Sequence, residues 1–124
     1  MTDRPIKSEE FHFTAAATNA PLITVDTSER IVITKCSAMV DNACSVDVGV
    51  RVALASATIA AVASGGVSGV VLSHPGVAAG SGVVEEAGGA SIGEGDSGDD
   101  VRLTSEVPTG GSLRVIVNYF LKSA

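Results

Sequence analysis

Aromatic residues are scarce in this sequence. They make up 3% of its 124 residues, and Trp is absent. The core must therefore be filled by Val, Ile, Leu and Ala, which account for most of the 45% of residues that are hydrophobic. Val and Ile lose little freedom when they are fixed in strands, because branching at Cβ already restricts their side chains. With 14 Gly residues to supply turns, this composition predicts an all-β fold of short strands.

Positive charge is also scarce. Eight Lys and Arg residues stand against 14 Asp and Glu residues, which gives a net charge of -6. A nucleic-acid-binding protein needs clustered basic residues to displace the counterions of the phosphates, and the basic residues here are scattered. Anionic membrane surfaces are disfavoured for the same reason. We therefore expect neither nucleic acid nor membrane as a partner.

A secretory leader and a disulfide framework are not expected either. The first 13 residues, "MTDRPIKSEEFHF", are polar and hold no apolar stretch of the kind a signal peptide needs. We expect synthesis and folding in a cytoplasm, where Cys36 and Cys44 stay reduced. The uncharged segment Val52 to Ser73 is long enough to span a bilayer, but its Gly and Ser interruptions argue against a membrane helix.

Alternating hydrophobic residues predict the strands. Residues 30–40 and 44–54 are predicted to form a hairpin around the turn Asp41-Asn42-Ala43, with Asp47, Gly49 and Arg51 on the face that meets solvent or a partner. Residues 113–121 form the last predicted strand, whereas residues 73–82 are predicted to be an irregular loop. Seven or eight strands in all predict an antiparallel β-sandwich over residues 21–124, either jelly-roll-like or Ig-like.

Residues 1–20 are predicted to form an extended N-terminal arm. Its large apolar residues are Ile6, Phe11 and Phe13, two of which are among the three Phe residues of the chain. The arm either docks on a partner subunit or folds back as an edge strand of its own domain. In the last predicted strand, Ile116 and Phe120 lie on the face opposite to the core. These five apolar residues are our candidates for partner contacts.

The segment "GEGDSGDD" (93–100) allows three interpretations. Gly95-Asp96-Ser97-Gly98 matches the tetrapeptide around the nucleophile of trypsin-like proteases, but such a nucleophile needs a histidine base, and only His12 and His74 exist. Four carboxylates suit calcium, although the spacing is not that of an EF-hand loop. A solvated turn between strands has the same composition and is the interpretation we favour.

Other candidate sites fail on spacing. No two of His12, His74, Cys36 and Cys44 have the short separation that structural zinc sites use. The glycine-rich segments lack the Lys of a phosphate-binding loop. We therefore predict no catalytic residue, no cofactor and no metal ligand, and no enzymatic activity.

Several short sequence phrases, taken in order, resemble a known family. "RIVITKCSAMVDNACSVDVGVRVAL" (30–54) follows a short strand and a polar turn. "HPGVAAGSGVV" (74–84) and "GEGDSGDDVRLTSEVPTGGSLRVIVNYF" (93–120) come next. Over residues 22–121, this layout resembles small β-sandwich virion proteins of tailed bacteriophages and phage-like particles.

The resemblance implies a structural role in a virion. The expected function is that of a capsid decoration (cement) protein, which binds the major capsid protein or other virion proteins and is often trimeric. The alternative is a carbohydrate-binding sandwich in a head or tail spike that acts in host attachment. Sugar sites usually stack rings on exposed aromatic residues, and without Trp only Tyr119 could serve.

Overall fold

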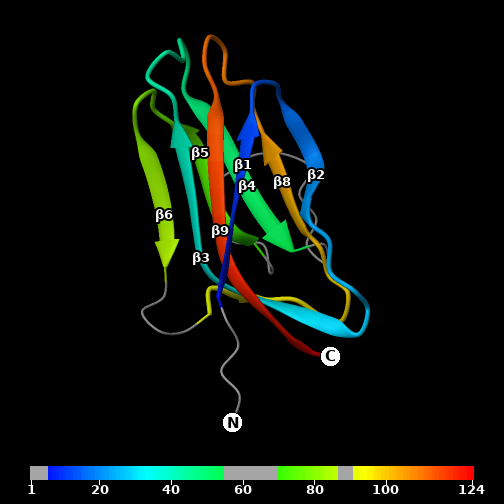
Figure 1. The fold of residues 1–124 in the computed structure, drawn as a ribbon. Coiled ribbons are helices and arrows are strands. Elements are labelled where there is room, and N and C mark those ends of the chain that lie inside the picture. Colours follow the sequence, from blue (N-terminus) through cyan, green and yellow to red (C-terminus); the bar gives the residue numbers. More distant parts are fainter. Residues whose placement is uncertain (1–5, 55–69, 87–90) are drawn as a thin grey trace.

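The computed structural model describes residues 6–54, 70–86 and 91–124. These residues form nine β-strands (Figure 1). The strands are β1 (Lys7–Phe13), β2 (Ala17–Ile23), β3 (Glu29–Val40), β4 (Val48–Leu54), β5 (Val70–Val77), β6 (Gly82–Glu86), β7 (Gly93–Glu94), β8 (Val101–Ser105) and β9 (Leu113–Ser123). The same described residues contain no helix long and apolar enough to cross a membrane.

The strands form two antiparallel sheets that pack face to face. Sheet A has the order β1-β9-β3-β6, and the short β7 also pairs with β3. Sheet B has the order β2-β8-β4-β5 and lies behind sheet A in Figure 1. The predicted all-β sandwich is therefore confirmed.

The strand order identifies the sandwich as a jelly roll. The first four strands pair with later strands in reverse order, as β1–β9, β2–β8, β3–β6 and β4–β5. A ribbon of paired strands that is wrapped in this way gives the two four-stranded sheets of a jelly roll. Of the two topologies that the sequence left open, the structure has the jelly-roll order.

The predicted hairpin between residues 30–40 and 44–54 is wrong. Its first strand is β3 in sheet A and its second is β4 in sheet B, so the turn between them crosses from one sheet to the other. The predicted open face of the second strand is correct only for Asp47, which is exposed just before β4. All seven residues of β4 are buried within the chain, including Gly49 and Arg51. Periodicity located both strands, although the second begins at Val48 and not at Cys44, but it carried no information on the sheet to which each belongs.

The core lies between the sheets and consists almost entirely of aliphatic side chains. Ile31 and Ile33 of β3 and alternate residues of β9 enter it from sheet A. A bulge in β3 at Thr34 shifts the alternation by one residue, so that Cys36 also points inward. Cys36 and Cys44 are both buried and unpaired.

Two other predictions concern the middle of the chain. Residues 73–77 belong to β5, so the loop predicted for residues 73–82 is wrong in its first half. Most of the apolar segment that we considered as a membrane helix, residues 55–69, lies outside the described residues.

Candidate interaction surface

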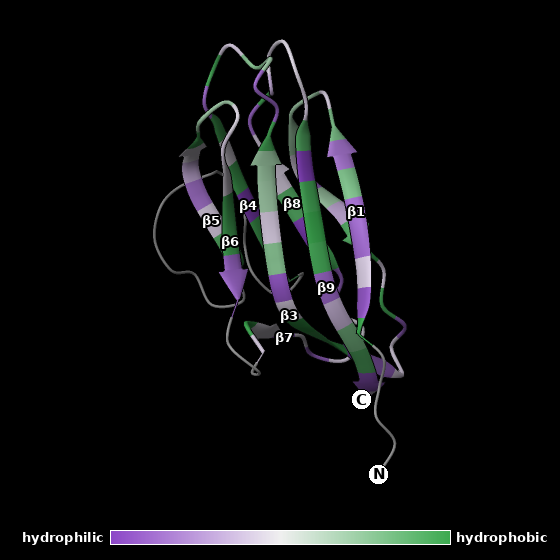
Figure 2. Cartoon of the chain, turned by 60° about the vertical axis from the view of Figure 1, so that its left-hand side comes forward, coloured by the Kyte–Doolittle hydropathy of each residue, from purple (hydrophilic) through white to green (hydrophobic). Residues whose placement is uncertain are grey.

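The outer face of sheet A is the side of that sheet that points away from sheet B. In an antiparallel ladder, residues directly opposite each other lie on the same face. Glu10 of β1, Ile116 of β9, Ser37 of β3 and Val84 of β6 are opposite one another in register and form one row across this face. In Figure 2, β9 lies between β3 and the more hydrophilic β1.

Four apolar side chains are accessible on this face. Ile116 and Phe120 are half-buried, and both were predicted from the sequence to point away from the core. Met39 and Val84, which the sequence analysis missed, are 45% and 56% exposed. Their place on the same face depends on the pairing of β6 with β3, which no local sequence signal reveals.

Phe11 and Phe13 lie elsewhere. They are opposite Val115 and Leu113 of β9 and pack against the core, so they face inward. Of the two possibilities for the N-terminal segment, the structure shows residues 7–13 as an edge strand of their own domain. Ile6, just before this strand, is exposed.

Tyr119 holds β1 against β9 from the inner side of sheet A. It lies opposite Lys7 in the ladder and is only 4% exposed. Its hydroxyl donates a hydrogen bond to the Glu9 carboxylate over 3.1 Å. Burial raises the pKa of Tyr119 to about 12, and this hydrogen bond adds to the effect. The ring is therefore not available for stacking on a sugar.

Ion pairs cover the rest of the outer face. Arg114 Nε lies 2.7 Å from Glu10 Oε1, and His12 Nε2 lies 2.9 Å from the same oxygen. A wider pair, at 4.0 Å, joins Lys35 to Glu86. Charges of both signs thus alternate with the apolar residues.

Glu94 forms a third ionic group, at the end of the face where β7 crosses β3. Lys122 Nζ lies 2.6 Å and Arg30 Nη2 3.2 Å from its Oε1 atom. The hydrogen bond from Lys122 lowers the pKa of Glu94, and the charges of Lys122 and Arg30 contribute further. This carboxylate therefore stays ionised at neutral pH and ties β7 to β9.

The acidic segment 95–100 is a turn between β7 and β8. Asp99 Oδ2 accepts a hydrogen bond from the Asp96 N–H over 2.9 Å, and Asp100 Oδ1 accepts one from the Val25 N–H over 3.1 Å. The Ser97 hydroxyl donates to the Thr27 carbonyl. These bonds are those of a turn that is held against the segment before β3. Among the residues that the structure describes, no three His, Cys, Asp or Glu side chains are grouped so that they could hold a metal ion.

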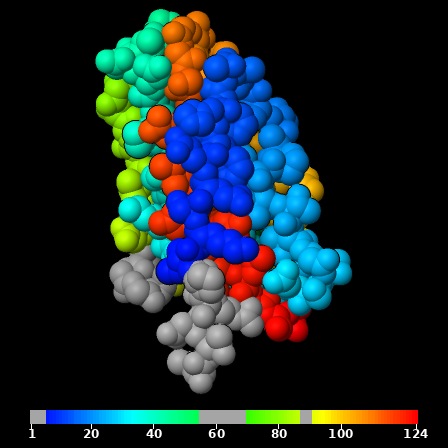
Figure 3. Space-filling view, viewed as in Figure 1, coloured from blue at the N-terminus to red at the C-terminus, as the bar shows by residue number. Residues whose placement is uncertain are grey.

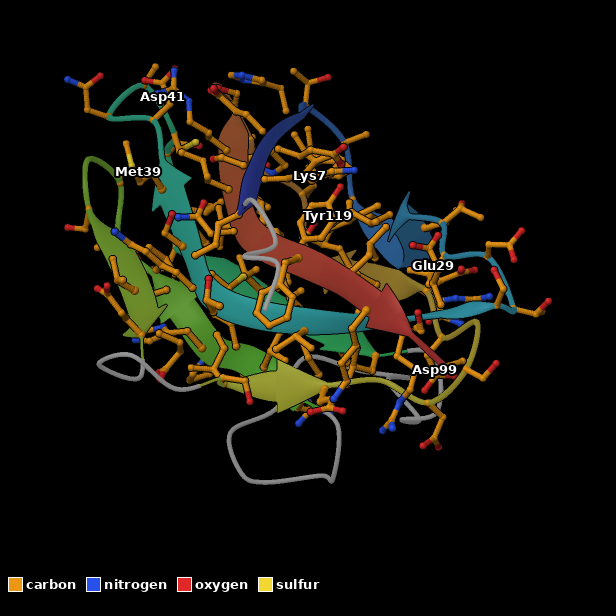
Figure 4. The ribbon with its side chains drawn as sticks, turned by 60° about the horizontal axis from the view of Figure 1, so that its bottom comes forward. Lys7, Glu29, Met39, Asp41, Asp99 and Tyr119 are labelled. Atoms are coloured by element: carbon orange, nitrogen blue, oxygen red, sulfur yellow. The ribbon has the colours of Figure 1, made fainter. Side chains whose placement is uncertain are left out.

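Ser97 and His12 lie near opposite ends of sheet A. His12 is opposite Arg114, which pairs with Met39 near the end of β3, whereas Ser97 contacts Thr27, just before β3 begins. At 3.3 Å per residue, the ten steps along β3 from Glu29 to Met39 separate them by about 33 Å. Figure 4 shows Met39 at one end of the molecule and Asp99 at the other. His74 is on sheet B, where its Nδ1 accepts a hydrogen bond from the Gly76 N–H.

Calcium is expected to leave the stability of the protein unchanged. The carboxylates of Asp99 and Asp100 already accept backbone hydrogen bonds, and Glu94 is neutralised by two basic residues. A ligand that binds only the folded state raises the melting temperature, by mass action. We expect no shift between 5 mM EDTA and about 5 mM CaCl2, a concentration well above the affinity range of most calcium modules. A rise of several degrees would show that the turn rearranges to bind the ion.

Comparison with known proteins gives a likeness of fold and none of sequence. No protein-family model matches the chain, and no curated protein is significantly similar to it. A chain of the acidic stable capsid structure of Helicobacter pylori bacteriophage KHP30 superposes with a TM-score of 0.62 and 12% identity, over 93% of this chain and 86% of that one. A chain of the capsid of Ralstonia phage GP4 gives a TM-score of 0.48 and 16% identity, over 100% and 92%. The first superposition shows a shared fold, and the second is too loose to support a conclusion.

Proposed function

We propose that this protein is a structural component of a phage virion, and that it acts as a capsid decoration protein. The observation that carries the proposal is the shared fold with the chain from the KHP30 capsid structure. The match covers most of both chains, so it compares one whole small sandwich with another. Jelly rolls recur in capsid proteins and in lectins, but fold alone does not determine function.

The charge of the chain supports a place on the outside of the particle. At a net charge of -6, the protein would be repelled by packaged nucleic acid if it lined the inner surface of a shell. On the outer surface, the same charge keeps the particle soluble. The partner is then the major capsid protein or another virion protein. As the sequence resemblance implies, we expect a homo-oligomer, with a trimer favoured.

Co-sedimentation with shells tests the proposal. Purified protein mixed with empty shells, assembled from the major capsid protein encoded in the same genome, is expected to pellet with them in a saturable manner. It should also raise the temperature at which the shells fall apart, because it binds only the assembled form. An unrelated acidic protein of similar size is the control. A protein that is strictly monomeric and stays in the supernatant with intact shells would refute the proposed function.

A further inference from the structure

Charge is distributed unevenly over the molecule. The described residues include seven basic and thirteen acidic side chains. The outer face of sheet A holds four of the basic ones but only three of the acidic ones, which gives it a balance of +1. All other described residues together hold three basic and ten acidic side chains, a balance of -7. The basic residues of the face are Arg30, Lys35, Arg114 and Lys122, and its acidic residues are Glu10, Glu86 and Glu94.

The same face carries four accessible apolar side chains, which lie on three of its strands. Ile116 and Phe120 both lie on β9. Met39 and Val84 add accessible apolar surface on β3 and β6. Figure 3 shows these strands side by side on the exposed front of the molecule, with β1 as their border. Aromatic residues, Met and Arg are enriched in protein interfaces, and this face presents one aromatic residue, one Met and two Arg residues.

The charges on this face can be covered at little cost. Each acidic residue of the face already has a basic partner within the chain, at distances between 2.6 and 4.0 Å. A charge that is buried without a partner is strongly destabilising. Because the pairs here are internal, a docked protein need not supply matching charges.

We propose that the outer face of sheet A is the surface by which this protein docks on the capsid shell. The proposal rests on the proposed function, and it specifies the chemistry of the partner: a protein surface that carries apolar groups and little net charge. The acidic remainder of the molecule then points away from the shell or along it.

The charge distribution favours the shell over a second copy as the occupant of this face. Two copies that paired through their outer faces would cover the charge-balanced surface of both. The pair would then present mainly the acidic remainder of each copy. Any contact with the shell would have to be made through these negatively charged surfaces. Contacts between copies on the shell are left to the other surfaces of the sandwich.

Substitutions at two exposed residues of the face test this proposal directly. Val84→Glu and Met39→Glu each replace an accessible apolar side chain of the face by a carboxylate, and because both side chains are exposed in the free protein, neither change should disturb the fold. Val107→Glu is the matched control, since Val107 is 47% exposed and lies in the connection between β8 and β9, outside the outer face. We expect Val84→Glu and Met39→Glu each to weaken binding to the assembled shells about tenfold or more. Val107→Glu should bind like the wild type, and all four proteins should have the same melting temperature within a few degrees.

The outcomes separate this inference from the function on which it rests. If the wild type does not bind shells, the proposed function fails, and the docking surface with it. If the wild type binds and Val84→Glu and Met39→Glu bind equally well, the function stands and the docking surface is wrong. Light scattering on the free proteins covers the remaining case. Should both substitutions dissociate an oligomer while shell binding persists, the face joins copies of this chain, and the inference is overturned.

Discussion

Raising the pH from 9 to 12 is expected to lower the free energy of unfolding by about 3 kcal/mol through Cys36 alone. This thiol is fully buried in the core, and burial is the main cause that raises its pKa from 9.0 to about 12, with a smaller effect of the nearby Glu85 charge. In the unfolded chain the thiol ionises near pH 9, whereas in the folded protein it stays neutral up to about pH 12. The stability that depends on this difference is complete below pH 9 and is lost as the pH rises toward 12.

Urea unfolding at a series of alkaline pH values measures the effect. In a Cys36→Ala variant the fall in stability should be much shallower, although this variant starts from a lower stability at neutral pH because it leaves a small cavity. The remaining slope is assigned to Tyr119, whose pKa is also raised to about 12. An unchanged slope in Cys36→Ala would mean that ionisation of Cys36 does not control the alkaline transition.

Leu103→Ala is expected to destabilise the protein by about 3 kcal/mol. Leu103 is fully buried in β8, the strand that joins β2 to β4 in sheet B, and it lies opposite Ala20 and Val52. Shortening the side chain removes apolar contacts and leaves a cavity, because neighbouring strands can relax only in part. Denaturant unfolding at pH 7 gives the value directly.

Val107→Ala is the control for the Leu103 substitution. Val107 is exposed in the connection between β8 and β9, so the change should alter the free energy of unfolding by no more than about 0.5 kcal/mol. Equal effects of the two substitutions would contradict the placement of Leu103 in the core.

The sequence was most informative where one face of a strand is buried and the other is open. In the segment 113–121, the alternation of apolar and polar residues predicted both the strand and the side that faces the core, because β9 packs on one face only. The same signal misled in β4. Arg51 implies an open face, yet that face is buried, and a local pattern cannot show what covers a strand.

Pairing between distant strands could not be predicted from periodicity. Asp41 and Asn42 mark a true turn, but the backbone angles of a turn do not show whether the chain returns to the same sheet or crosses to the other. For the same reason, the proposed docking surface could be predicted only in part. Ile116 could be placed on an outer face from β9 alone, whereas Val84 joins it only because β6 lies beside β3, about fifty residues away in sequence.

The order of strands in the jelly roll also determines when each sheet can form during synthesis. None of the first four strands pairs with another of the first four, because β9 lies between β1 and β3 and β8 lies between β2 and β4. A nascent chain that has emerged only as far as Leu54 therefore has no native strand partner for any of its backbone. Such a chain must avoid aggregation on the ribosome until the later strands are translated. We therefore expect chaperone binding during this interval to limit the yield of folded protein more than the stability of the finished fold does.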